Sequence, residues 1–363
     1  MLTRRRFLFF LGCAVLAVAP MGASADVGDD IRAAYLSSGQ LENPAKVREL
    51  VRLIEETELN AIVIDVKDSR VLLDPRHLAT LRLFKERGVY VIGRLITFQD
   101  SRLALDRKDL AVRSADGGLF LDGNPRWRRY WVEPAAKEAQ DWNIAIAKRV
   151  IDAGVDEVNF DYIRFPHQRS LVYPHWDLSL PKHAVMEEFF ARLRRELDLH
   201  MAARGVRAKL SIDVYGYVYL NGIEPGVGQR LLSAAKYFDV VAPMAYPSHY
   251  QCNEFGLKDP NLHPALVYER TLAKGLETLR AAGVTVATRP WIQDFSVPNI
   301  YGCRDPKRSE EYVVSAKGNI VVKYGAARVR AQIEAAKKLG VRGFMLWNPE
   351  SSYTENALLR KNN

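Results

Sequence analysis

The chain has 363 residues, a formal net charge of +9 and 48% hydrophobic residues. This length exceeds a typical single domain but suits one large barrel with loop insertions. Beyond the N-terminal segment, the basic residues are spread along the chain without a run of their own, which argues against a nucleic-acid partner. No stretch of that part approaches the ~18 apolar residues of a membrane span.

The first 25 residues are predicted to be an export signal. Three arginines at positions 4–6 precede an apolar run over 7–18, and small residues at 23–25 offer a cleavage site. The arginines with Phe7 and Leu8 resemble a twin-arginine signal, and an ordinary secretory signal with extra basic residues is the alternative. We therefore expect a mature domain over 26–363 that is periplasmic or secreted.

Strand-like and helical segments alternate along the rest of the chain. The first helix is predicted to start with Asn43 as its cap and Pro44 in its first turn. Gly-Val pairs at 88, 154, 205, 283 and 340 each end a helical stretch, because glycine can adopt the left-handed conformation, and lead into a strand. The eight predicted strands cover 32–37, 61–67, 89–96, 157–164, 208–215, 238–245, 285–292 and 342–348.

This alternation predicts an α/β protein with a parallel sheet, and eight strands predict closure into a single-domain (β/α)8 TIM barrel. An open, doubly wound sheet is the competing architecture, but no glycine-rich phosphate loop follows the first strand. Long polar loops are predicted after the third, sixth and seventh strands, over 97–134, 246–265 and 293–324. Loops of this length are often binding walls or lids.

Cys252 and Cys303 are the cysteines of the predicted mature chain. Both fall in loops expected on the same barrel face, and an oxidising compartment permits them to pair. Two cysteines without a close histidine pair argue against a zinc site, and we predict no metal and no cofactor.

Four acids stand at or just after strand ends, where barrel enzymes carry their chemistry: Asp65, Asp161, Asp213 and Asp294. Asp161 lies in an otherwise apolar strand, where an unpaired charge is costly, and is the leading catalytic candidate. Asp213 alternates with Ser211 and Tyr215 and is expected to point into the barrel mouth. Asp65 has an alternative reading as an ion pair with Lys67 or Arg94.

Aromatic and polar side chains accompany these acids. Flat rings beside hydrogen-bonding groups suit a sugar, whose faces are C–H and whose edges are hydroxyl, although each ring alone could be packing. The residues predicted to bind substrate are Asp65, Lys67, Arg94, Trp131, Arg164, Tyr215, Tyr246, His249, Trp291, Gln293, Trp347 and Asn348.

Several segments together resemble a glycoside hydrolase family long catalogued as a domain of unknown function. They cover 60–68, 156–166, 243–250, 289–295 and 346–348. The resemblance implies a barrel fold and glycosidase activity. Asp161 is also similar in placement to the nucleophile of α-amylase-type and α-galactosidase-type barrels, although the arginine that amylase-type enzymes carry two residues earlier is replaced by Asn159.

Two carboxyl groups flanking the bond are what glycoside hydrolysis requires. We expect Asp161 as nucleophile and Asp213 as acid/base in a retaining mechanism, with Asp161 and Asp294 as an alternative, inverting pair. Glu133 and Glu350 are reserve acids. The expected substrate is a bacterial envelope or exported polysaccharide. The rival hypothesis is a glycan-binding barrel without catalysis.

Overall fold

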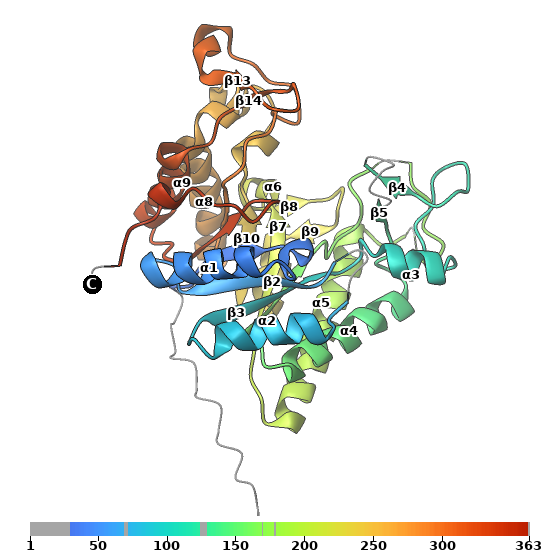
Figure 1. Cartoon of the computed structure of the whole chain (residues 1–363). Helices are drawn as coiled ribbons and strands as arrows, with labels where there is room; N and C mark the ends of the chain where they lie inside the picture. The colour runs from blue at the N-terminus through green and yellow to red at the C-terminus, as the bar shows by residue number, and fades with distance from the viewer. Residues whose placement is uncertain (1–29, 69–71, 124–128, 169, 178, 362–363) are drawn as a thin grey trace, which may run out of the picture.

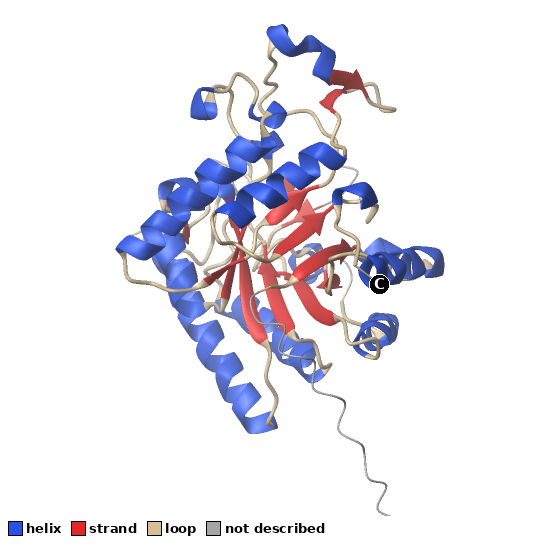
Figure 2. Cartoon of the chain, turned by 90° about the vertical axis from the view of Figure 1, so that its left-hand side faces the viewer, coloured by secondary structure: helices blue, strands red, loops and turns tan. Residues whose placement is uncertain are grey.

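The computed structural model describes residues 30–68, 72–123, 129–168, 170–177 and 179–361. The predicted export signal lies outside the described residues. A parallel sheet occupies the centre of the molecule, with helices packed around it (Figure 1). Seen from the side, the strands gather in the middle of a ring of helices, as Figure 2 shows.

The main sheet is entirely parallel, and its strands follow the order β11-β10-β7-β6-β3-β2-β1-β15-β12. Each predicted strand is present, with ends that differ by a few residues. The strands are β1 Arg32–Leu36, β2 Ala61–Lys67, β3 Tyr90–Ile96, β6 Glu157–Asp161, β7 Lys209–Tyr215, β10 Val240–Met244, β11 Ala287–Thr288, β12 Trp291–Gln293 and β15 Phe344–Trp347.

The seventh predicted strand is divided into β11 and β12 by Arg289 and Pro290. Proline has no N–H group and therefore interrupts a ladder of hydrogen bonds. The backbone N–H of Arg289 still donates to Val241 O at 3.0 Å, and Pro290 O accepts from Met345 N at 3.0 Å. The divided strand therefore joins the sixth strand to the eighth, which closes the barrel and confirms the predicted fold class.

Helices cover the outside of the barrel: α1 Pro44–Glu56, α2 Pro75–Lys85, α4 Lys137–Asp152, α5 Lys182–Arg204, α7 Leu231–Tyr237, α8 Pro264–Ala281 and α9 Ala326–Lys338. The cap at Asn43 is confirmed, because its side chain accepts from the N–H groups of Ala45 and Lys46 at 3.1 and 3.3 Å. The glycines of the five Gly-Val junctions have φ between 65° and 87°, as predicted. No described helix is long and apolar enough to cross a membrane.

Two apolar layers hold the fold together. The larger lies between the sheet and the helices, and a smaller one fills the barrel with side chains such as Ala33, Val63 and Met345. Strand β6 contributes polar residues to that interior, because Glu157 and Asp161 alternate with the outward-facing Val158 and Phe160. The interior of the barrel is therefore polar along one strand.

Long loops follow the third, sixth and seventh strands, as predicted, and the loop over 162–181 after β6 is a further long one. Cys252 and Cys303 form a disulfide between the loops after β10 and β12. The loops also contain short elements: α3 Ser101–Asp106, α6 Gly216–Asn221 and the hairpins β4 Leu121–Asp122 with β5 Arg129–Tyr130, β8 Ile223–Glu224 with β9 Gln229–Arg230, and β13 Tyr312–Val314 with β14 Ile320–Val322.

Candidate active site

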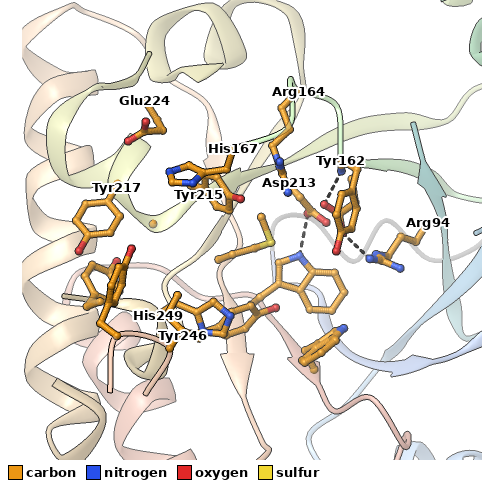
Figure 3. A pocket seen from close by; sticks show the side chains of 18 residues that line it. Arg94, Tyr162, Arg164, His167, Asp213, Tyr215, Tyr217, Glu224, Tyr246 and His249 are labelled. Atoms are coloured by element: carbon orange, nitrogen blue, oxygen red, sulfur yellow. Dashed lines mark hydrogen bonds and ion pairs between the residues drawn. The ribbon is translucent and has the colours of Figure 1, made fainter. Parts of the chain in front are cut away.

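A pocket of about 320 Å³ lies at the carboxyl ends of the strands (Figure 3). This volume is in the range of ligand-binding cavities. Nine residues predicted from the sequence line it: Arg94, Asp161, Arg164, Asp213, Tyr215, Tyr246, His249, Trp291 and Trp347. The structure therefore brings together Asp161 and Asp213 with most of the predicted aromatic side chains.

Asp161 is the last residue of β6 and is 4% exposed. One carboxylate oxygen accepts from Nη2 of Arg94 at 2.5 Å, and the other accepts from the backbone N–H of Tyr162 at 2.6 Å. Tyr162 has φ of 49°, an uncommon conformation for a residue with a bulky side chain. This bend at the end of β6 places the N–H of Tyr162 against the carboxylate, and such local strain is often found at functional sites.

Asp213 lies on the neighbouring strand β7, one register step beyond the pair Phe160 and Ile212. Its Oδ1 accepts from Nδ2 of Asn159 at 2.9 Å and from Nε1 of Trp291 at 2.8 Å. Its Oδ2 is buried and has no hydrogen-bond partner among the described residues. Burial, and next the negative charge of Asp161, hold the pKa of Asp213 well above its usual range. The surroundings of Asp213 therefore favour its protonated form.

Arg94 lies between two acids inside the barrel. Its Nη1 donates to Asp65 Oδ1 at 2.7 Å, and Tyr35 Oη donates to Asp65 Oδ2 at 2.6 Å. Burial raises the pKa of Asp65, and the guanidinium of Arg94 opposes this shift. Asp65 is not among the residues that line the pocket. Its predicted alternative, an ion pair with Arg94, is what the structure shows.

Lys67, predicted to bind substrate, does not line the pocket. The register of β2 against β3 shifts between Asp65 and Lys67, so that Lys67 pairs with the outward-facing Leu95. A β-bulge of this kind reverses the face to which the next side chain points. The Lys67 amine donates to Asn143 of α4 at 2.9 Å and lies 2.9 Å from a carboxylate oxygen of Asp100. Lys67 is therefore held beneath a helix, outside the pocket.

Asp294, Gln293 and Asn348 also lie outside the pocket. The Asp294 carboxylate accepts from the N–H and hydroxyl of Thr354 at 2.8 and 2.6 Å. Gln293 Oε1 accepts from Ser248, and Asn348 Nδ2 donates to the backbone oxygen of Asp294. The protein itself satisfies these polar strand ends, so the structure does not bring Asp294, Gln293 and Asn348 into the pocket with the other predicted residues.

Trp131 is 1% exposed, and its Nε1 donates to Asp122 at 2.8 Å, so it supports the pocket wall from behind and does not contact the cavity. The reserve acid Glu133 is fully buried and accepts from the N–H and ring of His175. The second reserve acid, Glu350, is exposed beyond β15 and is also outside the pocket. Neither reserve acid is placed to replace Asp213.

Sequence analysis left several residues of the pocket out of the predicted site. Glu224 comes from the hairpin β8–β9, which was not predicted from the sequence. Its Oε1 accepts from the N–H of Gly226 at 3.2 Å. The loop directly after Asp161 supplies two more of these pocket residues. Its position directly after a predicted catalytic acid is the sequence signal that could have identified them. The complete set of such residues is Tyr162, His167, Gly216, Tyr217, Glu224, Met244, Tyr250, Ile300 and Tyr301.

His249 lines the pocket, and its Nδ1 lies 2.9 Å from the hydroxyl of Ser248. Burial lowers the pKa of His249 to about 4, so the imidazole is neutral at neutral pH. It can therefore exchange hydrogen bonds with a sugar hydroxyl without adding charge to the pocket. Among the described residues, no group of three or more potential ligand side chains could hold a metal ion.

The barrel is similar to those of solved glycoside hydrolases. The glycoside hydrolase domain of PgaB (BpsB) from Bordetella bronchiseptica aligns with a TM-score of 0.58 and 14% identity, over 88% of this chain and 94% of that one. A class V chitinase from Nicotiana tobaccum aligns with a TM-score of 0.53 and 14% identity, over 90% and 97%. An α-galactosidase from Thermus thermophilus aligns with a TM-score of 0.50 and 15% identity, over 89% and 59%. At these identities the similarity concerns the fold.

A comparison with curated protein sequences gave no match. A family model does match, over residues 71–353, which is most of the chain. That family is DUF4015, described as "Putative glycosyl hydrolase domain". The matched range contains Asp161, Asp213 and Glu224 of the pocket and every strand from β3 to β15. This chain therefore belongs to the DUF4015 family of glycosyl hydrolase domains.

Proposed function

We propose that this protein is a secreted glycoside hydrolase that uses Asp161 as nucleophile and Asp213 as acid/base. One observation carries the proposal: two inward-facing carboxyl groups on neighbouring strands share a pocket but differ in environment. Asp161 is paired with Arg94, whereas Asp213 is buried, and one of its oxygens has no hydrogen-bond partner among the described residues. Glycosidases typically use two acids in different surroundings, one of which is ionised while the other donates a proton.

In the first step, a carboxylate oxygen of Asp161 attacks the anomeric carbon while Asp213 gives its proton to the departing glycosidic oxygen. The product is a covalent ester between the sugar and Asp161. In the second step, Asp213, now a carboxylate, takes a proton from water, and the resulting hydroxide oxygen displaces Asp161 from the sugar. Asp161 leaves as a carboxylate, Asp213 is again protonated, and the bond has been hydrolysed.

The register of the strands supports retention of configuration. Adjacent strands are about 4.7–4.9 Å apart, and retaining glycosidases separate their carboxyl groups by about 5–5.5 Å. Asp161 and Asp213 lie on the paired strands β6 and β7. The inverting pair of Asp161 with Asp294 loses its support, because Asp294 is bonded to Thr354 outside the pocket.

The substrate and its location extend the same proposal. The leader at 1–25 supports export of a mature domain over 26–363, and export would place the enzyme beside envelope or exported polysaccharides. Aromatic side chains around the cavity, including Tyr246, Trp291 and Trp347, offer faces for sugar rings.

The test is a mechanism-based trap. The protein is first screened against bacterial envelope and exported polysaccharides for release of reducing ends, and the cleaved sugar is then supplied as its 2-deoxy-2-fluoro glycosyl fluoride. We expect the mass of the peptide containing Asp161 to rise by one fluorosugar, and the first product observed by proton NMR to keep its anomeric configuration. An inverted first product would exclude Asp161 as nucleophile.

A glycan-binding barrel without catalysis is the second candidate, and the burial of Asp213 favours it. Asp213 is 1% exposed, which leaves little access for a leaving group in this conformation. A binding protein would hold the same oligosaccharide equally well after the change Asp161→Asn and would release no reducing ends from any polysaccharide.

A further inference from the structure

Arg164 is a buried cation in the pocket without a carboxylate partner. It is 7% exposed and lines the cavity three residues after Asp161. Among the described residues, no carboxylate lies within ion-pair distance of its guanidinium. The other two buried arginines, Arg94 and Arg289, are both paired with acids. Because an unpaired buried charge is costly, an arginine of this kind calls for an explanation.

Aromatic rings fix the position of this guanidinium. Its central carbon lies 4.6 Å from the ring centre of Tyr215, 4.9 Å from that of Tyr162 and 5.0 Å from that of Trp131. Ring faces attract a cation, but they carry no net charge and accept only weak hydrogen bonds. The three rings therefore orient the guanidinium and leave its positive charge unneutralised.

Most of the hydrogen-bonding capacity of Arg164 remains available. Nη1 donates to the backbone oxygen of Phe165 at 3.1 Å, and Nε is buried without a partner among the described residues. A guanidinium has five N–H groups in a planar fork that fits two oxygens of a carboxylate. Figure 3 shows the Arg164 side chain extending into the pocket, on the side of Asp213 and Tyr162.

The ionisable groups of the pocket are arranged at two sides. Glu224 and Tyr217 lie together at one side, and Arg164 and Asp213 lie at the other, with His167 and Tyr215 between them (Figure 3). Asp161 shares Arg94 with Asp65, and among the described residues no ion pair joins Asp161 to Arg164. A negatively charged ligand group would be attracted to Arg164 and repelled from Glu224.

We propose that Arg164 binds the carboxylate of a uronic acid unit, so that the preferred substrate is an acidic glycan. This inference rests on the proposed function and deepens it by naming the substrate class. Two parallel N–H···O bonds from one guanidinium to a carboxylate are strong and orient the sugar ring as well as attract it. The three rings around the guanidinium lower the entropy lost on binding, because they hold the fork in place.

The test compares methyl glycosides of glucuronic, galacturonic and mannuronic acid with those of glucose, galactose and mannose. Binding to the purified protein is followed through the fluorescence of Trp291 and Trp347, which line the pocket. We expect at least one uronoside to bind ten times or more tightly than its neutral parent. We expect Arg164→Met to abolish that preference and Arg164→Lys, which keeps the charge but not the fork, to retain part of it.

Lys182 provides a matched control. Its amine is held over the rings of Phe165, Tyr173 and Trp176 at 5.1–5.6 Å, but it does not line the pocket. Lys182→Met removes the same kind of cation–ring contact at the start of α5, and it should leave the uronoside preference unchanged. Thermal unfolding of each variant confirms that it is folded.

The inference is overturned if no uronoside binds more tightly than its neutral parent, or if the preference survives in Arg164→Met. These outcomes are separable from the fate of the proposed function. Uronoside preference without hydrolysis of any polysaccharide would refute the hydrolase and keep the carboxylate site. Hydrolysis of a neutral glycan without any uronoside preference would keep the hydrolase and refute the site.

Discussion

Two arginine–carboxylate clusters lie inside the barrel, and they differ in what surrounds them. The upper cluster joins Arg94 to Asp65 and Asp161. The lower cluster joins Arg289 to Glu157, with distances of 2.8 and 2.9 Å from Nη1 to the two carboxylate oxygens. The upper cluster contributes Arg94 and Asp161 to the pocket, whereas neither residue of the lower cluster lines it.

The difference follows from position along one strand. Glu157 begins β6 and Asp161 ends it, so the two acids are separated by roughly 13 Å along the strand direction. In a barrel of this kind, the carboxyl ends of the strands hold the chemistry and the amino ends contribute stability. The comparison shows that an ion pair of the same kind can contribute to a pocket or only to stability. Which of the two it does depends on whether a cavity lies beside it.

The largest effect on kcat is expected from a substitution in the upper cluster. Asp161→Asn removes the proposed nucleophile and keeps the shape of the side chain, so kcat should fall by about 10⁴-fold or more. The free energy of unfolding should change much less than kcat. Hydrolysis rates on the polysaccharide identified by the screen, together with denaturant unfolding, measure the two quantities. If kcat did not change, the inference that the upper cluster is functional and the lower cluster is structural would be wrong.

The variant Asp213→Asn tests whether the second acid is the proton donor. Because burial and the charge of Asp161 raise the pKa of Asp213, wild-type kcat/KM should decline as the pH rises through that pKa and the proton donor is lost. The variant should lack this alkaline decline and lose about 10²–10⁴-fold in kcat on natural glycans. Aryl glycosides with acidic leaving groups should be cleaved almost as fast as by the parent. An equal loss on both substrates would contradict proton donation by Asp213.

Glu157→Gln tests the lower cluster. It leaves the charge of Arg289 buried without a charged partner, and Nε and Nη2 of Arg289 already lack partners among the described residues. Loss of one member of a buried ion pair typically costs about 3–5 kcal/mol in the free energy of unfolding. The surface pair of Lys148 and Glu196, 3.0 Å apart, provides the control, since Glu196→Gln should cost below about 1 kcal/mol.

Urea unfolding measures both variants, and hydrolysis at a temperature where Glu157→Gln is folded measures its activity. We expect kcat within about fivefold of wild type, because Glu157 lies outside the pocket. A large loss of kcat with normal stability would reverse the assignments of the two clusters.

The smallest effect is expected at Asp294, an acid near the mouth that the protein covers. Asp294→Asn retains one oxygen for Thr354 and loses the other, which should cost about 1–2 kcal/mol in the free energy of unfolding and leave kcat within about threefold of wild type. Steady-state kinetics and thermal unfolding measure the two effects. A loss of kcat comparable to that of Asp161→Asn would restore Asp294 as a catalytic acid.

Local sequence signals predicted most of the fold. Gly-Val junctions and Asn43 act within a few residues of the chain, and the structure confirms both. The sequence shows Pro290 within the seventh predicted strand, so an interruption could be expected there. It does not show that the strand is divided into β11 and β12. Whether the flanking halves pair with different neighbours depends on residues 241 and 345, far apart in the sequence.

Prediction of the site was less complete because alternation along a strand assumes an unbroken register. That assumption holds for Asp213 and Tyr215, and it fails for Lys67, where a bulge reverses the face. Likewise, Asp161 and Asp294 look alike in the sequence as acids near strand ends. They are distinguished by Thr354, which lies 60 residues beyond Asp294 and covers it.

The sequence by itself determined that strands and helices alternate, where the turns fall and that acids and aromatic residues gather at strand ends, because these properties depend on neighbours in the chain. The tertiary structure decided which of those side chains face a cavity. Hydrogen-bond partners and charges from distant segments satisfy some polar groups, such as Asp294, and leave others, such as Arg164, with capacity for a ligand. Solvation and pairing are properties of a packed environment, and no single segment contains them.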